Sequence, residues 1–438
     1  MSQGLGAKSA PMSARVWLVA GLASVLASCS GLPGATTTAA STAWPTKADV
    51  KPTTAFTADG LAALDARMKE AVDKGQVAGL EYVLIKNGKV VAFNIFGEAT
   101  HGGPPMAEDT IFRVRSMTKP ITGVAMMQLY EKGVWKPEDP VTKFWPELGA
   151  MKVATSQADL NNLVPAARPA NMNEVMTHTA GFGYGLSAAS AVDREFQANN
   201  PMAQKDLPTL VKRVSEIPLL AQPGERWSYS IAVDVQGAIV EKTSGMSFGE
   251  YLEKNVFAPL GMKDSGFWLT EAEKSRFATV YTRNATTGQQ EVYPDGYSFY
   301  DHSHAESGGG GLTSTTHDYA RFAQMLLNDG ELDGKRILKP ESVKLMMTNH
   351  IGGLRSMNGG GFGWGGAVQT NPPSDRSPLP LGAFDWFGID GTWFWVDPTN
   401  DIAFVGMIQR RGSAGQGSIN LRGESAQLVY KALVPPTK

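Results

Sequence analysis

The sequence contains little of several residue types, and each shortage excludes a class of protein. Its 438 residues include one cysteine, Cys29, so no disulfide can form within the chain. The net charge of −2 at pH 7 gives no electrostatic support for binding nucleic acid. Histidine, the common general base, occurs six times, and no pattern ties any of the six to a nucleophile. We therefore look for a base of another kind, and we expect neither a metal nor a cofactor.

The remaining composition is that of a globular enzyme. Hydrophobic residues make up 42% and charged residues 19% of the chain, which is enough to bury a large core. The 48 glycines and 26 prolines predict many turns and long loops.

The apolar run near the N-terminus is too short to span a membrane comfortably. Lys8 and Arg15 precede residues 16–23, and the sequence Leu-Ala-Ser-Cys then ends at Cys29. This order resembles a lipoprotein signal, in which the cysteine is lipidated; an ordinary secretory signal is the alternative. We expect anchoring in the cell envelope, on the periplasm-facing outer membrane in a Gram-negative cell.

Three regions follow from this interpretation. Residues 1–28 form a signal peptide, and residues 29–55, rich in Ser, Thr, Ala, Gly and Pro, form a flexible tether. Residues 56–435 form a hydrolase domain with a helical insertion at about 135–300.

Strand patterns lie near both ends of this domain. Asn87-Gly88 separates two β-rich runs, 80–86 and 89–96, and predicts a hairpin. Further strands are predicted at 384–388, 392–396 and 401–409. Helical patterns lie between and around these strands, at 60–74, 116–133, 207–217, 231–243, 317–328, 340–347 and 418–433. We therefore predict a mixed α/β (α+β) fold whose antiparallel sheet is completed by both ends of the domain.

Ser116-x-x-Lys119 is the first candidate for chemistry. An i, i+3 spacing places both side chains on one helix face, where the amine can hydrogen-bond the hydroxyl. Pro120 is tolerated only in the first turn of a helix, so the helix begins at about Ser116. The Ser-x-x-Lys motif is common by chance. Other residues that could act with Ser116 must therefore show whether it is catalytic.

A second serine motif, Gly-x-Ser-x-Gly at 245–249, matches the nucleophile elbow of other hydrolases. That elbow requires a strand before it, whereas here a predicted helix ends at Gly245. Ser247 and Glu250 match a capping box, so we interpret Ser247 as a helix cap.

Tyr229 is the better partner for Ser116, because it also lies where a loop enters a helix. A phenol has an ordinary pKa near 10, and a nearby ammonium favours its ionised form. Lys119 could therefore make Tyr229 an effective base. His178 and His317 are interpreted as structural.

Several motifs together resemble the serine β-lactamase-related hydrolases, and most closely the family VIII carboxylesterases, which are similar to class C β-lactamases and D-alanyl-D-alanine peptidases. The resemblance covers roughly residues 56–435 and is carried by residues 112–122, 177–181, 229–231 with Asp234 and Gly237, and 393–398. It implies a β-lactamase/transpeptidase-like fold, with an antiparallel sheet flanked by helices plus an all-helical region. It also implies an acyl-enzyme on Ser116, with Lys119 and Tyr229 as the base system.

The third motif of this family concerns the substrate. β-Lactamases carry Lys-Thr-Gly on the strand facing the serine, and the resemblance places Trp386-Phe387-Gly388 there. Trp364-Gly365-Gly366 is the alternative register. Ile231 also replaces the asparagine of the β-lactamase tyrosine motif. Without that cation and amide, a carboxylate loses its charge-assisted contacts, and an apolar site suits neutral acyl groups.

The resemblance further implies an oxyanion hole formed by the backbone N–H groups of Ser116 and Ile389. We assign Trp386, Phe387, Gly388, Phe182 and Tyr184 to substrate binding.

The sequence thus predicts a serine carboxylesterase that cleaves small short-chain esters and contacts the membrane through its lipid anchor. Two alternatives remain open. One is a β-lactamase or a D-alanyl-D-alanine peptidase of the penicillin-binding type. The other is a non-catalytic binding protein of the same fold.

Overall fold

The computed structural model describes residues 44–435 except 285, 358, 375–377 and 413–418. These residues belong to one compact unit, and Cys29 with the predicted signal peptide lies outside the described part. Within that part, no helix is both long and apolar enough to cross a membrane.

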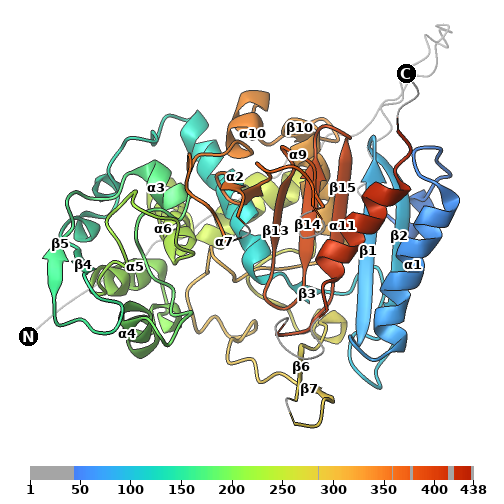
Figure 1. Cartoon of the computed structure of the whole chain (residues 1–438), viewed down its shortest axis with the longest axis horizontal. Coiled ribbons are helices and arrows are strands. Elements are labelled where there is room, and N and C mark those ends of the chain that lie inside the picture. Colours follow the sequence, from blue (N-terminus) through green and yellow to red (C-terminus); the bar gives the residue numbers. More distant parts are fainter. Residues whose placement is uncertain (1–43, 285, 358, 375–377, 413–418, 436–438) are drawn as a thin grey trace, which may run out of the picture. The chain divides into compact units, whose positions relative to one another are not determined.

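A seven-stranded antiparallel sheet forms the centre of this unit (Figure 1). Its order, β11-β12-β13-β14-β15-β1-β2, joins the last strands of the chain to the first, as the sequence predicted. The hairpin at Asn87-Gly88 is confirmed, whereas β11 and β12 were not predicted. The strands are β1 (Gly79–Lys86), β2 (Lys89–Gly97), β11 (Gly361–Phe362), β12 (Ala367–Val368), β13 (Phe384–Phe387), β14 (Trp393–Asp397) and β15 (Ile402–Met407).

Strand alternation gives the sheet two buried faces. In β1, Tyr82 and Leu84 pack with α1 (Ala58–Asp73) and α11 (Leu421–Ala432). Val83 and Ile85 point to the opposite face and join the larger core. Successive side chains of a strand point to opposite faces, which explains why β1 is apolar almost throughout.

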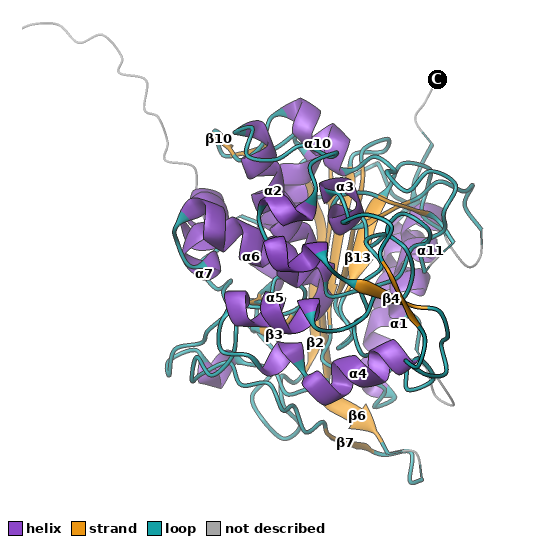
Figure 2. Cartoon of the chain, turned by 90° about the vertical axis from the view of Figure 1, so that its left-hand side faces the viewer, coloured by secondary structure: helices purple, strands orange, loops and turns teal. Residues whose placement is uncertain are grey.

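Figure 2 looks onto the helices of the larger core, with strands of the sheet behind them. This core contains α2 (Thr118–Glu131), which is buried on nearly all sides. The other helices are α3 (Met172–Met176), α4 (Ala191–Asn199), α5 (Leu207–Ser215), α6 (Ala232–Ser244), α7 (Phe248–Leu252), α8 (Ala258–Leu260), α9 (Thr316–Leu327) and α10 (Pro340–Met346).

Short strand pairs complete the connections between these elements. They are β3 (Phe112–Arg113) with β8 (Thr313–Ser314), β4 (Lys152–Ala154) with β5 (Leu163–Pro165), β6 (Tyr281–Arg283) with β7 (Gln290–Val292), and β9 (Glu331–Leu332) with β10 (Lys335–Arg336).

Residues 44–55 differ from the predicted flexible tether. The carbonyl of Trp44 accepts a hydrogen bond from Arg321 at 2.5 Å, and the Lys51 N–H donates to Val90 at 3.1 Å. These contacts tie the segment to α9 and β2, so the ordered unit begins before the predicted boundary.

Ser247 has the structural role that its context predicted. It caps α7 through a reciprocal capping box with Glu250. A helix, α6, precedes it and ends at Gly245, so the arrangement of a nucleophile elbow is absent at this serine.

Candidate active site

Ser116 lies in a 3₁₀ turn (Arg115–Met117) that leads directly into α2. Pro120 falls in the first turn of that helix, where its missing N–H costs no hydrogen bond. Arg115, just before the serine, has a φ of 46°, in the left-handed region that non-glycine residues rarely adopt. Such strained backbone persists only where its surroundings hold it, and it is concentrated at functional sites.

Three predicted catalytic side chains meet at this turn. The Tyr229 hydroxyl hydrogen-bonds Ser116 Oγ at 2.7 Å, and Lys119 Nζ donates to the same oxygen at 3.3 Å. Lys119 Nζ also lies 4.5 Å from the centre of the Tyr229 ring. Lys119 is fully buried, so its charge acts on both hydroxyls in a medium of low dielectric constant.

His178 holds the segment that carries Tyr229. Its carbonyl accepts from the Ser228 N–H at 2.9 Å, and its Nδ1 accepts from the Ser230 N–H at 3.2 Å. Its ring lies 4.9 Å from that of Tyr229. Burial, reinforced by the charge of Lys119, holds the pKa of His178 well below its usual value. The imidazole is therefore neutral and structural, in keeping with our interpretation.

Asp234 holds the other side of Lys119. Its Oδ1 accepts from the Ser307 hydroxyl at 2.5 Å and from the Gly309 N–H at 3.2 Å, while the Gly309 carbonyl accepts from Lys119 at 2.6 Å. Burial raises the pKa of Asp234, although Ser307 and Lys119 oppose the shift. A Cβ on Gly309 would overlap Asp234, so only glycine fits here.

The sequence analysis assigned no role to Ser307 and Gly309. The run of four glycines at 308–311 was the available signal, because repeated glycine marks close backbone approach. The glycine run is far from Ser116 in the sequence, so the sequence alone did not show which group it approaches.

The residues that follow the C-terminal end of β13 lie next to the turn that carries the serine. A Cβ on Gly388 would lie 2.5 Å from both Thr392 Oγ1 and the Val114 carbonyl, so glycine allows the strand to approach the turn closely. Ile389 follows with a half-exposed side chain, at 53%. Neither the Ser116 nor the Ile389 N–H donates a hydrogen bond within the described chain, which leaves both available to a ligand.

A cavity of about 630 Å³ opens over these residues. Ser116, Tyr229, Tyr184, Trp386 and residues 387–389 all line it. The remaining wall contains both apolar side chains and four arginines: Leu186, Met202, Met357, Trp393, Ile408, Ile419 and Leu421, with Arg115, Arg410, Arg411 and Arg422.

Two sequence candidates lie elsewhere. Phe182, assigned to substrate binding, is 2% exposed and packs in the core, whereas Tyr184, two residues later, lines the cavity. Trp364, from the alternative register, is also buried, and its indole N–H donates to Asn173 at 3.0 Å. The structure thus places Trp386, and not Trp364, beside Ser116.

Comparisons with known proteins identify relatives of this chain. The sequence model of the Beta-lactamase family matches residues 64–426. Protein Rv1367c of Mycobacterium tuberculosis is 34% identical over 365 residues, covering 78% of this chain and 88% of that protein. Esterase EstB of Burkholderia gladioli is 29% identical over 406 residues, covering 86% and 98%.

A solved structure, EstCE1, described as a hydrolase with promiscuous acyltransferase activity, superposes with a TM-score of 0.71. The match has 25% identity and covers 85% of this chain and 99% of EstCE1. The fold is therefore β-lactamase/transpeptidase-like, as predicted.

Proposed function

The chain belongs to the beta-lactamase family, and from this membership and the geometry at Ser116 we propose that it is a serine carboxylesterase. The observation that carries the proposal is the contact of one hydroxyl with both a phenol and an ammonium, at 2.7 and 3.3 Å. The similarity to Esterase EstB and EstCE1 supports an ester as the substrate.

In the proposed reaction, Ser116 Oγ attacks the carbonyl carbon of the ester. Tyr229, in its phenolate form beside the Lys119 ammonium, takes the serine proton and returns it to the departing alcohol. The N–H groups of Ser116 and Ile389 stabilise the oxyanion of the tetrahedral intermediate, which can lower the barrier by about 3–4 kcal/mol per donor. Water then attacks the acyl carbon, Tyr229 takes its proton and passes it to Ser116 Oγ, and the bond between that oxygen and the acyl group breaks to release the acid.

The apolar part of the cavity wall, next to Ser116, supports neutral, apolar acyl groups as the substrate class. Trp386 and Phe387 line the cavity where the resembling β-lactamases carry a lysine and a threonine. Apolar walls with a few convergent polar groups are typical of sites for such ligands. We therefore favour short-chain esters over β-lactams and over D-alanyl-D-alanine peptides.

Two chromogenic substrates test the proposal. The purified protein should hydrolyse p-nitrophenyl butyrate, and Ser116→Ala should abolish this activity. A chromogenic cephalosporin should be cleaved far more slowly. Comparable cleavage of the cephalosporin would favour a β-lactamase, and absence of turnover on both substrates would favour a binding protein.

For the N-terminal segment we propose lipidation at Cys29 and a location in the cell envelope, on the sequence pattern alone. Membrane fractions of cells that produce the full chain should contain the protein. Cys29→Ala should move it to the soluble fraction, and unchanged membrane association of this variant would refute the lipid anchor.

A further inference from the structure

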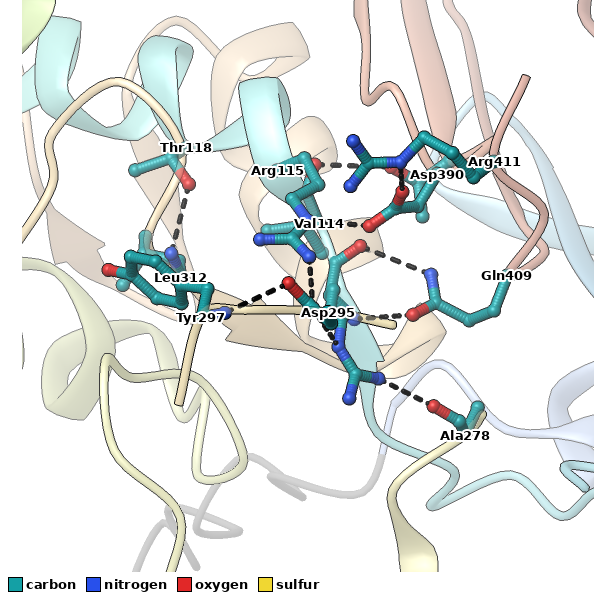
Figure 3. Close-up of polar contacts among 12 residues, drawn as sticks. Val114, Arg115, Thr118, Ala278, Asp295, Tyr297, Leu312, Asp390, Gln409 and Arg411 are labelled. Carbon is teal, nitrogen blue, oxygen red and sulfur yellow. Dashed lines mark hydrogen bonds and ion pairs between the residues drawn. The ribbon is translucent and has the colours of Figure 1, made fainter. Parts of the chain in front are cut away.

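Arg115, the residue before the nucleophile, belongs to a network of buried and partly buried ion pairs (Figure 3). Arg115 Nε donates to Asp390 Oδ2 at 2.5 Å, and its Nη2 pairs with Asp295. Arg411 Nε donates to the other oxygen of Asp390 at 2.5 Å. The Asp390 side chain is fully buried, so both its oxygens are satisfied by guanidinium groups away from water.

The position of the Arg115–Asp390 pair in the chain relates it to the two oxyanion-hole donors. Arg115 directly precedes Ser116, and Asp390 directly follows Ile389. The Arg115–Asp390 pair therefore joins the two backbone segments whose N–H groups would form the oxyanion hole. Burial lowers the pKa of Arg115, but Asp390 and Asp295 more than compensate and raise it above the ordinary value.

A second contact joins the same two segments. Thr392 Oγ1 donates to the carbonyl of Val114 at 3.2 Å, and the Gly388 N–H donates to the Thr392 carbonyl at 2.8 Å. The turn from Gly388 to Thr392 is thus bonded to both residues that precede the serine. Its backbone also packs directly against the Val114 carbonyl, as the space around Gly388 shows.

We infer that Arg115 and Asp390 are positioning residues that set the separation of the two oxyanion-hole donors. This inference rests on the proposed function. It adds to that function by naming the residues that hold the oxyanion hole in place. Charge-assisted hydrogen bonds are shorter and stronger than neutral ones. They also hold Arg115 in its left-handed conformation, which orients the peptide that carries the Ser116 N–H.

Arg115 also lines the cavity, so direct contact with a substrate must be distinguished from positioning. Its Nε and Nη2 are already engaged by Asp390 and Asp295. Asp390 offers the cleaner test, because both its oxygens are bonded to guanidinium groups.

The first measurement is the rate at which an alkyl fluorophosphonate labels Ser116. Ser116 Oγ forms a bond to phosphorus, the P–F bond breaks, fluoride leaves, and Tyr229 takes the proton, while the phosphonyl oxygen occupies the oxyanion hole. We expect Asp390→Ala to slow labelling about 10²-fold, the usual effect of losing one oxyanion donor. Asp390→Asn, which keeps one acceptor, should fall between this variant and wild type.

The second measurement separates positioning from general damage to the fold. A thionoester places sulfur, a weak hydrogen-bond acceptor, where the ester has oxygen. The ratio of kcat/KM for an ester to that for its thionoester therefore reports the oxyanion hole. Asp390→Ala should lower this ratio about tenfold or more, and Thr392→Val should lower it less, with Thr392→Ser restoring it.

The control is Asp264→Asn, which breaks a 2.6 Å ion pair with Arg276 outside the cavity. This variant should leave the labelling rate and the ratio unchanged. If folded Asp390→Ala kept the wild-type labelling rate and the wild-type ester-to-thionoester ratio, the inference would be overturned. Ester turnover by the wild-type protein would still support the esterase in that case. A wild-type protein that is not labelled would overturn both.

Discussion

The phenolic oxygen of Tyr229 lies 2.7 Å from Ser116 Oγ, although 113 positions separate the two residues in the chain. Their elements, the turn before α2 and the segment before α6, pack in the same core. Acyl transfer requires a nucleophile within hydrogen-bonding distance of a base. Ser116 and Tyr229 meet this requirement, and the ammonium of Lys119 lies beside both.

Removal of the phenolic oxygen should stop proton transfer and leave the packing intact. Tyr229→Phe keeps the ring that contacts His178 and Trp386. We expect kcat for p-nitrophenyl butyrate to fall about 10²–10⁴-fold, the range for loss of a general base. Thermal unfolding should show nearly the wild-type Tm. Activity within a few-fold of wild type would mean that another group takes the proton.

A methyl group on Gly388 should displace the segment that follows β13 from the turn that carries the serine. The added Cβ would meet Thr392 Oγ1 and the Val114 carbonyl at 2.5 Å. We expect Gly388→Ala to lower kcat about 10²-fold by misplacing one oxyanion donor, and stability by about 1–3 kcal/mol from overpacking. Steady-state kinetics and denaturant unfolding measure the two effects.

Gly353→Ala is the matched control for that substitution, because nothing lies within 4 Å of the added atom. It should change neither kcat nor stability appreciably. If the two alanine variants behaved alike, close approach at Gly388 would not matter for the site.

Much of this arrangement follows from the sequence, since the signals involved are local. Asn87-Gly88 gave the hairpin, Pro120 the start of α2, and the capping box the role of Ser247. A sheet completed by both ends of the domain was also predicted, because strand patterns lie near both ends of the sequence.

The contacts that the sequence did not reveal are long-range. The Gly309 carbonyl reaches Lys119 across 190 positions, and Arg115 reaches Asp390 across 275. No periodicity or motif encodes such pairings. Phe182 was misassigned because no periodicity in this loop shows that its side chain packs in the core while Tyr184, two residues later, lines the cavity.

His178 predicts a specific dependence of stability on pH. Its pKa is depressed in the folded state, so below about pH 6.5 the unfolded chain binds a proton that the folded chain does not. This group's contribution is therefore complete near pH 7 and is lost as pH falls, by at most about 1.4 kcal/mol per pH unit.

Comparison with His178→Asn isolates that contribution. Asparagine tolerates the left-handed backbone of this position, where φ is 61°. The Tm of wild type minus that of His178→Asn should shrink between pH 7 and pH 5 in calorimetric scans. A difference that stays constant or grows over this range would show that His178 is not held neutral.

The apolar rim of the cavity predicts which substrates gain from it. Leu186 is 61% exposed at the rim and would be covered by a long acyl chain. Leu186→Ser should raise KM several-fold for p-nitrophenyl octanoate and leave that for the acetate unchanged, because only the longer chain buries the side chain.

Leu381→Ser is the control for the rim, since Leu381 is similarly exposed, at 52%, but does not line the cavity. It should leave both KM values unchanged. An equal effect of Leu186→Ser on acetate and octanoate would argue against acyl-chain binding at this rim.

Identification of the covalent intermediate tests the central claim most directly. Wild-type protein mixed with p-nitrophenyl butyrate and quenched in acid should yield one butyrylated peptide by mass spectrometry, with the butyryl group on Ser116. Ser116→Ala should yield none. A butyryl group on any other residue, or turnover without a covalent adduct on Ser116, would contradict the account.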